Sequence, residues 1–199
     1  MKKKDTIFRC WIQGLWLIGV FVVTVNGFIL RASADSSNYA RHVDREVGIE
    51  LNILWPLKPF STYEVKVLLP ISNGADLVIG FGRQAWTMKD NGKINGGSMD
   101  SNALIIGAKQ FLFHTSTVVE YDAWLAHDRL TSEDGKVYAG WSLSNEFYGG
   151  YQFYLGSTRS WVSTGMNAGF WSFKSYEAPK NDRFVLTVLP KITAGFEAK

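Results

Sequence analysis

The sequence is short of cysteine and of long apolar runs, and each shortage excludes something. Its single cysteine, Cys10, precedes the one long apolar run, so the rest of the chain has no cysteine. Disulfides, thiolate metal sites and cysteine nucleophiles are therefore excluded from that part. No second stretch approaches 18 apolar residues, so the remainder contains no candidate transmembrane helix.

An excess of one charge is also missing. Of 21 basic and 18 acidic residues, five basic and one acidic lie in residues 1–34, which leaves 16 basic and 17 acidic residues. This near balance gives no reason to propose nucleic acid as a partner. The charged fraction of 20% is too high for a helical membrane protein.

Specific catalytic and cofactor motifs are absent as well. The three histidines, His42, His114 and His127, are dispersed and have no cysteine nearby, which does not suit a zinc site. The glycine-rich residues 95–97 lack the Gly-Lys-Ser/Thr of a phosphate loop. We therefore expect no enzyme, no cofactor and no metal.

Two catalytic alternatives stay open. His127, with Asp128, Ser132 or Glu133 nearby, is a conceivable triad for a lipid hydrolase at the rim of a fold. Glu120 and Asp122 lie two residues apart, so on a strand they would share one face as an acid–base pair.

The N-terminus has the parts of an export signal. Met1–Asp5 is basic, residues 15–30 are almost continuously apolar, and residues 32–34 (Ala-Ser-Ala) form a small-x-small cleavage site. The apolar run is short for a spanning helix, which favours cleavage over an uncleaved anchor. We expect a signal peptide over 1–34 and a short periplasmic leader over 35–46.

After residue 46 the pattern alternates with a period of two, which is typical of β-strands. In residues 47–55, for example, Val47, Ile49 and Leu51 alternate with Gly48 and Glu50. The pattern predicts eight strands, at residues 47–55, 63–69, 76–88, 102–113, 119–126, 139–155, 161–176 and 184–196.

The connections between these strands differ at the two ends. Those after strands two, four and six are short, whereas residues 89–101 and 132–136 form longer polar loops. Short turns at one end and longer loops at the other are typical of outer-membrane barrels. The prediction is an all-β fold over 47–199: an eight-stranded antiparallel up-and-down transmembrane β-barrel.

Alternation alone also fits a soluble lipocalin-like barrel with an apolar interior. The apolar positions, however, carry many large rings, such as Trp55, Tyr121 and Phe147. These would crowd the interior of eight strands, whereas a lipid-facing surface accepts them. The opposite positions are rich in small residues, such as Ser142 and Gly165, which suit a tight interior. Both arguments favour the membrane.

The inward positions include charged residues, which must pair or hold water in a packed interior. Such a set indicates an ion-pair network that plugs the barrel; the alternative is the lining of a narrow conduit. The predicted network consists of Glu50, Glu64, Lys66, Glu120, Asp122, Glu146 and Lys191.

Aromatic residues near the strand ends suit the two interfacial belts of a membrane barrel. The predicted belt residues are Trp55, Trp86, Trp141, Phe153, Trp161 and Tyr176.

The last strand, Val188-Leu-Pro-Lys-Ile-Thr-Ala-Gly-Phe196, alternates apolar residues and ends on an aromatic ring. With the strand count and loop asymmetry, it resembles the small eight-stranded outer-membrane proteins typified by the OmpA membrane domain, OmpX and OmpW. The resemblance covers about residues 47–199 and implies that Phe196 is part of the signal for the barrel-insertion machinery. The chain departs from that pattern by continuing through residues 197–199.

The expected function is a structural or surface-interaction role in the bacterial outer membrane, as a monomer. Outer-membrane lipid and lipopolysaccharide are its expected surroundings, and the loops at 89–101 and 132–136 are its expected contact sites. Transport of small or hydrophobic molecules, a lipid A-modifying enzyme and a soluble periplasmic binder remain alternatives, because barrels of this size serve unrelated functions.

Overall fold

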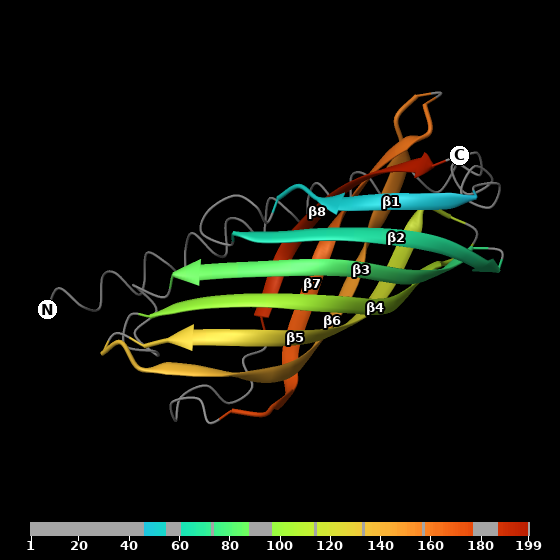
Figure 1. The fold of residues 1–199 in the computed structure, drawn as a ribbon. Coiled ribbons are helices and arrows are strands. Elements are labelled where there is room, and N and C mark those ends of the chain that lie inside the picture. The colour runs from blue at the N-terminus through green and yellow to red at the C-terminus, as the bar shows by residue number, and fades with distance from the viewer. Residues whose placement is uncertain are drawn as a thin grey trace, which may run out of the picture. The chain divides into compact units, whose positions relative to one another are not determined.

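The described chain forms a closed barrel of eight antiparallel strands in a computed structural model, as predicted (Figure 1). No helix among these residues is long and apolar enough to cross a membrane. The predicted signal (1–34) and leader (35–46) lie outside the described residues, apart from Glu46. The structure describes residues 46–54, 61–72, 74–87, 97–113, 115–132, 134–156, 158–176 and 187–198.

Each strand pairs with its neighbours in the sequence, and the last strand returns to the first. Ile49 pairs with Phe196, and Figure 1 shows β8 in red beside β1 in blue. Closure leaves no unpaired strand edge, so backbone groups are satisfied within the wall. The strands are β1 Val47–Asn52, β2 Thr62–Ser72, β3 Ala75–Thr87, β4 Ser98–Phe111, β5 Thr117–Thr131, β6 Val137–Tyr154, β7 Ser160–Lys174 and β8 Thr187–Ala198.

The strands differ from the predicted bounds mainly at the end with the long loops. β4 begins at Ser98, so residues 98–101, predicted as loop, belong to a strand. The reason is a continuous register, in which Ser98 pairs with both Thr87 and Thr131. The first strand, in contrast, ends at Asn52 rather than at residue 55.

Two of the short turns have the same backbone design. The Leu112 N–H donates to Thr117 across one turn, and the Leu155 N–H donates to Ser160 across the other, both at 2.9 Å. The next residue has positive φ in each case, 56° at Phe113 and 58° at Gly156. Gly156 adopts positive φ readily because it has no Cβ. Phe113, whose side chain is exposed, has the same conformation in the other turn.

Side chains alternate between the two faces of the wall, as the sequence pattern predicts. In β2 the outward Val65 and Val67 are exposed, while the inward Glu64, Lys66 and Leu68 are buried. In β2 the charged side chains therefore lie inside and the exposed valines outside. This is the reverse of the lipocalin arrangement.

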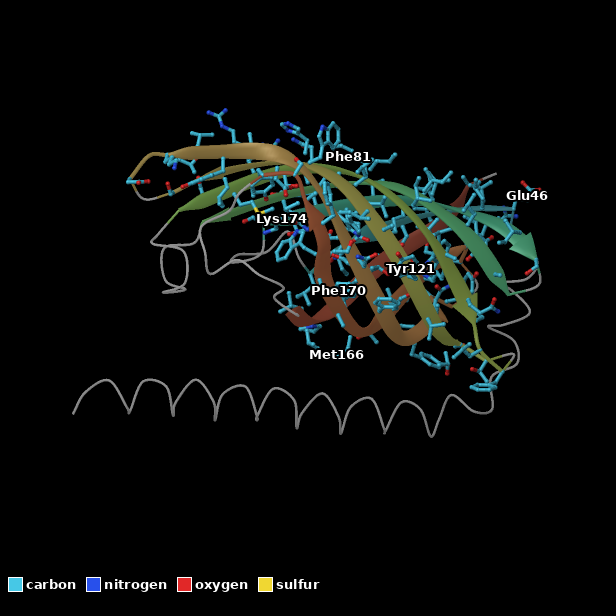
Figure 2. All side chains as sticks on the ribbon, turned by 90° about the horizontal axis from the view of Figure 1, so that it is seen from below. Glu46, Phe81, Tyr121, Met166, Phe170 and Lys174 are labelled. Atoms are coloured by element: carbon cyan, nitrogen blue, oxygen red, sulfur yellow. The ribbon has the colours of Figure 1, made fainter. Side chains whose placement is uncertain are left out.

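On the outer wall of β3–β6, residues that pair across neighbouring strands form rows perpendicular to the strands. Three successive rows are almost wholly apolar, and we call them the apolar band. Figure 2 shows side chains on this surface, with Phe81 and Tyr121 labelled. From the turn end toward the loop end, the rows are Leu77, Ala108, Tyr121, Phe147; then Ile79, Ile106, Ala123, Asn145; then Phe81, Leu104, Leu125, Leu143.

The polar groups within this band bond to one another at a β-bulge in β7. The Tyr121 hydroxyl donates to Asn145 Oδ1 at 2.8 Å, and Asn145 Nδ2 donates to Ser172 Oγ at 2.9 Å. The register between β6 and β7 shifts here, because Ser144 pairs with Trp171 and Ser172 is the extra residue. Asn145 is only 9% exposed, so its amide is shielded within the apolar wall.

Candidate functional site

The barrel interior contains a buried group of charged side chains centred on Lys66. The Lys66 ammonium forms ion pairs with Glu64 on its own strand and with Glu120 and Asp122 on β5. The distance from Lys66 Nζ to Glu120 Oε1 is 2.5 Å. An ammonium has three N–H donors, so these carboxylates use all of its capacity.

A second lysine binds a carboxylate from the first strand. Lys109 Nζ lies 2.6 Å from Glu50 Oε2 and 3.8 Å from Glu120 Oε2. The Trp161 indole N–H, from β7, donates to the same Glu50 oxygen at 3.2 Å. Glu50 thus joins β1, β4 and β7 through one carboxylate oxygen.

A third lysine, Lys191 on β8, bonds to Glu64 Oε1 at 2.9 Å and lies 3.8 Å from Glu146 Oε2 on β6. The Asn52 amide donates to the other Glu64 oxygen at 3.2 Å. Glu64 is therefore shared between Lys66 and Lys191, which connects the contacts into one network.

We call the whole set the lumen ion cluster. Its members come from six of the eight strands, and none is more than 7% exposed. Five carboxylates face three ammonium groups, so the cations are the scarcer partners. Desolvated carboxylates are costly unless each has a cation or donor nearby. The cluster consists of Glu50, Glu64, Lys66, Lys109, Glu120, Asp122, Glu146 and Lys191.

Inward glycines make room for these side chains. A Cβ at Gly107 would lie 2.2 Å from Asp122 Oδ1, and a Cβ at Gly80 would lie 3.0 Å from Lys66 Cγ. The first distance is too short for a real side chain, and at Gly80 a Cβ would also lie only 2.6 Å from the Val65 carbonyl oxygen. The cluster therefore needs glycine at Gly80 on β3, next to β2, and at Gly107 on β4, next to β5.

Apolar side chains lie on both sides of the cluster along β5. Val118 precedes Glu120 and packs with Phe111 and Tyr148 on the turn side. On the loop side, Trp124 follows Asp122 and packs with apolar side chains of β4, including Ile105. The interior along β5 is therefore a charged layer between two apolar layers.

A smaller polar group lies farther toward the loops. Asp128 Oδ1 accepts from the Ser101 hydroxyl at 2.6 Å, and Asp128 Oδ2 accepts from the Tyr176 hydroxyl at 2.8 Å. Lys174 Nζ lies 4.5 Å from the centre of the Trp171 ring. Tyr176, after the β7 bulge, thus passes over Gly140 of the intervening strand β6 to bond to β5.

The structure places all seven predicted lumen charges inside the barrel and adds Lys109 to them. The sequence pattern missed Lys109 because β4 is apolar on both faces, with Ile105 inward and Ile106 outward. Alternation in β4 therefore assigned no face. Lys109 lies two residues from Gly107, a small residue of the kind expected inside the barrel. This spacing could have placed Lys109 inside as well.

The predicted aromatic belt is wrong for two of its members. Trp161 is fully buried inside the barrel, where Glu50 accepts its N–H, and Tyr176 bonds to the inward Asp128. Both rings carry a polar hydrogen that finds a buried carboxylate, which an outward position does not offer. Trp141 and Phe153 do lie on outward positions. Trp55 and the Trp86 side chain lie outside what the structure describes.

The conceivable catalytic groups are not assembled. His127 faces outward and Asp128 inward, because they are adjacent on one strand. Glu120 and Asp122 are both occupied by Lys66. Within the described ranges, no group of three or more His, Cys, Asp or Glu residues is placed to hold a metal ion.

The loop predicted as a contact site at residues 132–136 forms a tight turn around Asp134. The Ser132 hydroxyl donates to Asp134, and the Lys136 N–H donates to Asp134 Oδ1 at 3.2 Å. The Ser132 hydrogen bond in particular lowers the pKa of Asp134, so this exposed turn keeps its negative charge. The other predicted contact loop lies outside the described residues between 88 and 96.

The last strand places Phe196 on the outer wall, where it is 44% exposed. It pairs with Ile49 of β1 and with Ser160 of β7, so it lies at the closure of the barrel. Beyond it, the Glu197 N–H donates to the Arg159 carbonyl in the β6–β7 turn at 3.0 Å. The residue after Phe196 is thus still part of the paired wall.

Comparison with known proteins gives few matches. No protein-family model matches the chain. No curated protein matches it either. Among solved structures, it is similar to the N-terminal β-barrel domain of Pseudomonas aeruginosa OprF, with 14% identity, a TM-score of 0.41, and coverage of 76% of this chain and 96% of that one.

Proposed function

We propose that this chain is an outer-membrane β-barrel with a structural or surface-interaction role and a plugged interior. It is exported by the signal at residues 1–34 and cleaved near Ala34, and it acts as a monomer. The observation that carries the proposal is the lumen ion cluster enclosed by a wall whose outer face carries the apolar band. In water an exposed apolar band of this kind is unfavourable, whereas in a membrane it faces lipid chains.

The dimensions of the wall support a membrane setting. A strand of about 9–11 tilted residues crosses the hydrocarbon core. Strands β3 to β7 have 13 to 18 residues, which is enough to cross and to project beyond the membrane. Closed barrels are one of the two structures that satisfy their backbone in lipid. The projecting end is the one with the longer loops, which in this family type faces outward.

The interior supports a closed barrel rather than a pore. Lys66 is bonded to carboxylates from two strands, and apolar side chains lie on both sides of that layer. An ion crossing it would have to break several buried ion pairs, each costly to separate. A transport role would need a continuous lumen, so we place the function on the outer surface and loops.

Three parts of the chain would contact partners: the apolar band, the last strand and the turn at residues 132–136. The apolar band would contact outer-membrane lipid, with lipopolysaccharide in the outer leaflet. The insertion machinery would read the last strand through Phe196. The turn at residues 132–136, with its charged Asp134, is the described part of the contact surface.

Cell fractionation tests the membrane proposal. We expect the native chain in the detergent-extracted outer membrane, where an unboiled sample migrates as a folded band that shifts on boiling. Resistance to unfolding by gel detergent is expected from a closed hydrogen-bonded wall. Recovery of the folded chain from the periplasmic fraction would contradict the proposal and favour a soluble binder.

A further inference from the structure

Two rows that include polar and charged side chains lie directly beyond the apolar band on the outer wall. They are on the loop side of β3–β6, and all of their charged members are exposed. The first row is Arg83, Asn102, His127 and Trp141, and the second is Ala85, Asp100, Arg129 and Ala139.

The change from apolar to basic is abrupt. Arg83 is two residues from Phe81 on β3, and His127 is two residues from Leu125 on β5. Two residues along a strand span roughly 7 Å. If the apolar band lies in the hydrocarbon, these basic groups lie at the depth of the lipid headgroups.

Cationic charge exceeds anionic charge in these rows. Arg83 lies 3.4 Å from Asp100, but both side chains are more than half exposed, so this pair is weak. Arg129 makes no ion pair with any residue that the structure describes. These rows therefore hold two guanidinium groups and one carboxylate, and His127 lies on the same face of β5, two residues from Arg129.

The aromatic neighbour of this patch also suits a membrane surface. The Trp141 ring packs edge-on against His127 with 5.3 Å between ring centres, and Trp141 is 53% exposed. Indole rings favour the region where lipid chains meet headgroups. At the opposite end of these four strands, the outward row holds no charge: Ala75, Gln110, Val119 and Gly149.

We propose that Arg83 and Arg129, with His127 beside them, bind the phosphate groups of a phosphorylated glycolipid in the outer leaflet. Arginine suits this ligand because its planar fork donates two parallel hydrogen bonds to phosphate oxygens. The apolar band directly below accommodates the acyl chains of the same lipid. This inference rests on the proposed function, since it needs the band to lie in the membrane.

The test is the thermal unfolding of the barrel in phosphatidylcholine vesicles, followed by tryptophan fluorescence. The vesicles contain no additive, bisphosphorylated lipid A, or dephosphorylated lipid A, and a further sample receives inorganic phosphate. We compare the native chain with Arg83→Gln/Arg129→Gln. The matched control is Arg159→Gln, at an exposed arginine in a turn at the other end.

Bisphosphorylated lipid A is expected to raise the unfolding temperature of the native chain and of Arg159→Gln, and the double variant is expected to lose most of this rise. The inference would be overturned if dephosphorylated lipid A or inorganic phosphate alone raised the unfolding temperature of the native chain equally. It would also be overturned if bisphosphorylated lipid A raised that of the double variant equally. The inference would also be overturned if the phosphates of lipid A did not change the unfolding temperature of the native chain. That result is expected if the patch binds an acidic protein instead. Failure of the native chain to insert would instead overturn the proposed function.

Discussion

Replacing Lys66 with methionine is expected to destabilise the barrel by about 3–5 kcal/mol, because it leaves buried carboxylates without their cation. Lys66 is 1% exposed and contacts Glu64, Glu120 and Asp122. The cluster already holds more carboxylates than ammonium groups, so no other lysine is spare. We expect a large fall in the urea midpoint of the vesicle-inserted barrel, measured by tryptophan fluorescence.

Two further variants separate charge from packing. Lys136→Met removes an exposed lysine from the β5–β6 turn and is expected to change the midpoint little. Adding Glu120→Gln and Asp122→Asn to Lys66→Met removes two of the stranded charges, so part of the stability should return. A Lys66→Met midpoint equal to that of the Lys136 variant would contradict the account. No recovery in the triple variant would mean that packing, not charge, explains the loss.

Trp161→Ala is the second change with a large expected effect. The ring is fully buried, packs edge-on against Tyr154 with 5.9 Å between centres, and contacts Leu68 and Val78. Its truncation leaves a cavity and removes the N–H donor of Glu50, so we expect a loss of about 3–5 kcal/mol. The urea midpoint of the inserted barrel measures it.

The outward Trp141 provides a matched control, since it is the same residue type on the outer face. Trp141→Ala is expected to cost clearly less than Trp161→Ala, because no cavity forms inside the wall. Trp161→Phe should give an intermediate loss, since it keeps a ring but not the hydrogen bond. Equal losses at Trp161 and Trp141 would contradict the inward position of Trp161.

The sequence predicted the architecture well because strand alternation is a local property. A side chain two residues from another on a strand shares its face, so Glu120 and Asp122 could be assigned together without knowledge of any partner. Turn residues then separated the strands. Some bounds shifted where register extends a ladder through polar residues, as between Thr87 and Ser98, whereas the first strand ended early, at Asn52.

The pairing inside the barrel could not be predicted in the same way. Lys66 and Glu120 are 54 residues apart, and their contact depends on how far one strand slides along the next. Alternation gives a face but not this stagger. It also fails where both faces are apolar, which is why Lys109 was missed.

The two misplaced aromatic residues have different causes. Trp161 lies four residues from Gly165, a position already expected to face inward, so alternation within this strand could have placed it inside the barrel. Tyr176 follows a bulge, which adds one residue at Ser172 and thereby exchanges the two faces. A bulge depends on pairing with the neighbouring strand, so its effect on later residues appears only in the fold.

Lipid access to the outer wall of β4 tests most directly whether the barrel spans a membrane. Residues 11–199 contain no cysteine, so single cysteines can be introduced into a Cys10→Ser background and labelled with a small fluorophore. Ile106 lies in the apolar band, and Ser98 faces the same way roughly 27 Å farther along the strand.

We expect opposite responses at these two positions in vesicles. A label at Ile106→Cys should be quenched by brominated lipid chains and not by aqueous iodide, whereas a label at Ser98→Cys should be quenched by iodide. Quenching of both labels by iodide and of neither by brominated lipid would mean that the apolar wall does not lie in the membrane. That result would contradict the account.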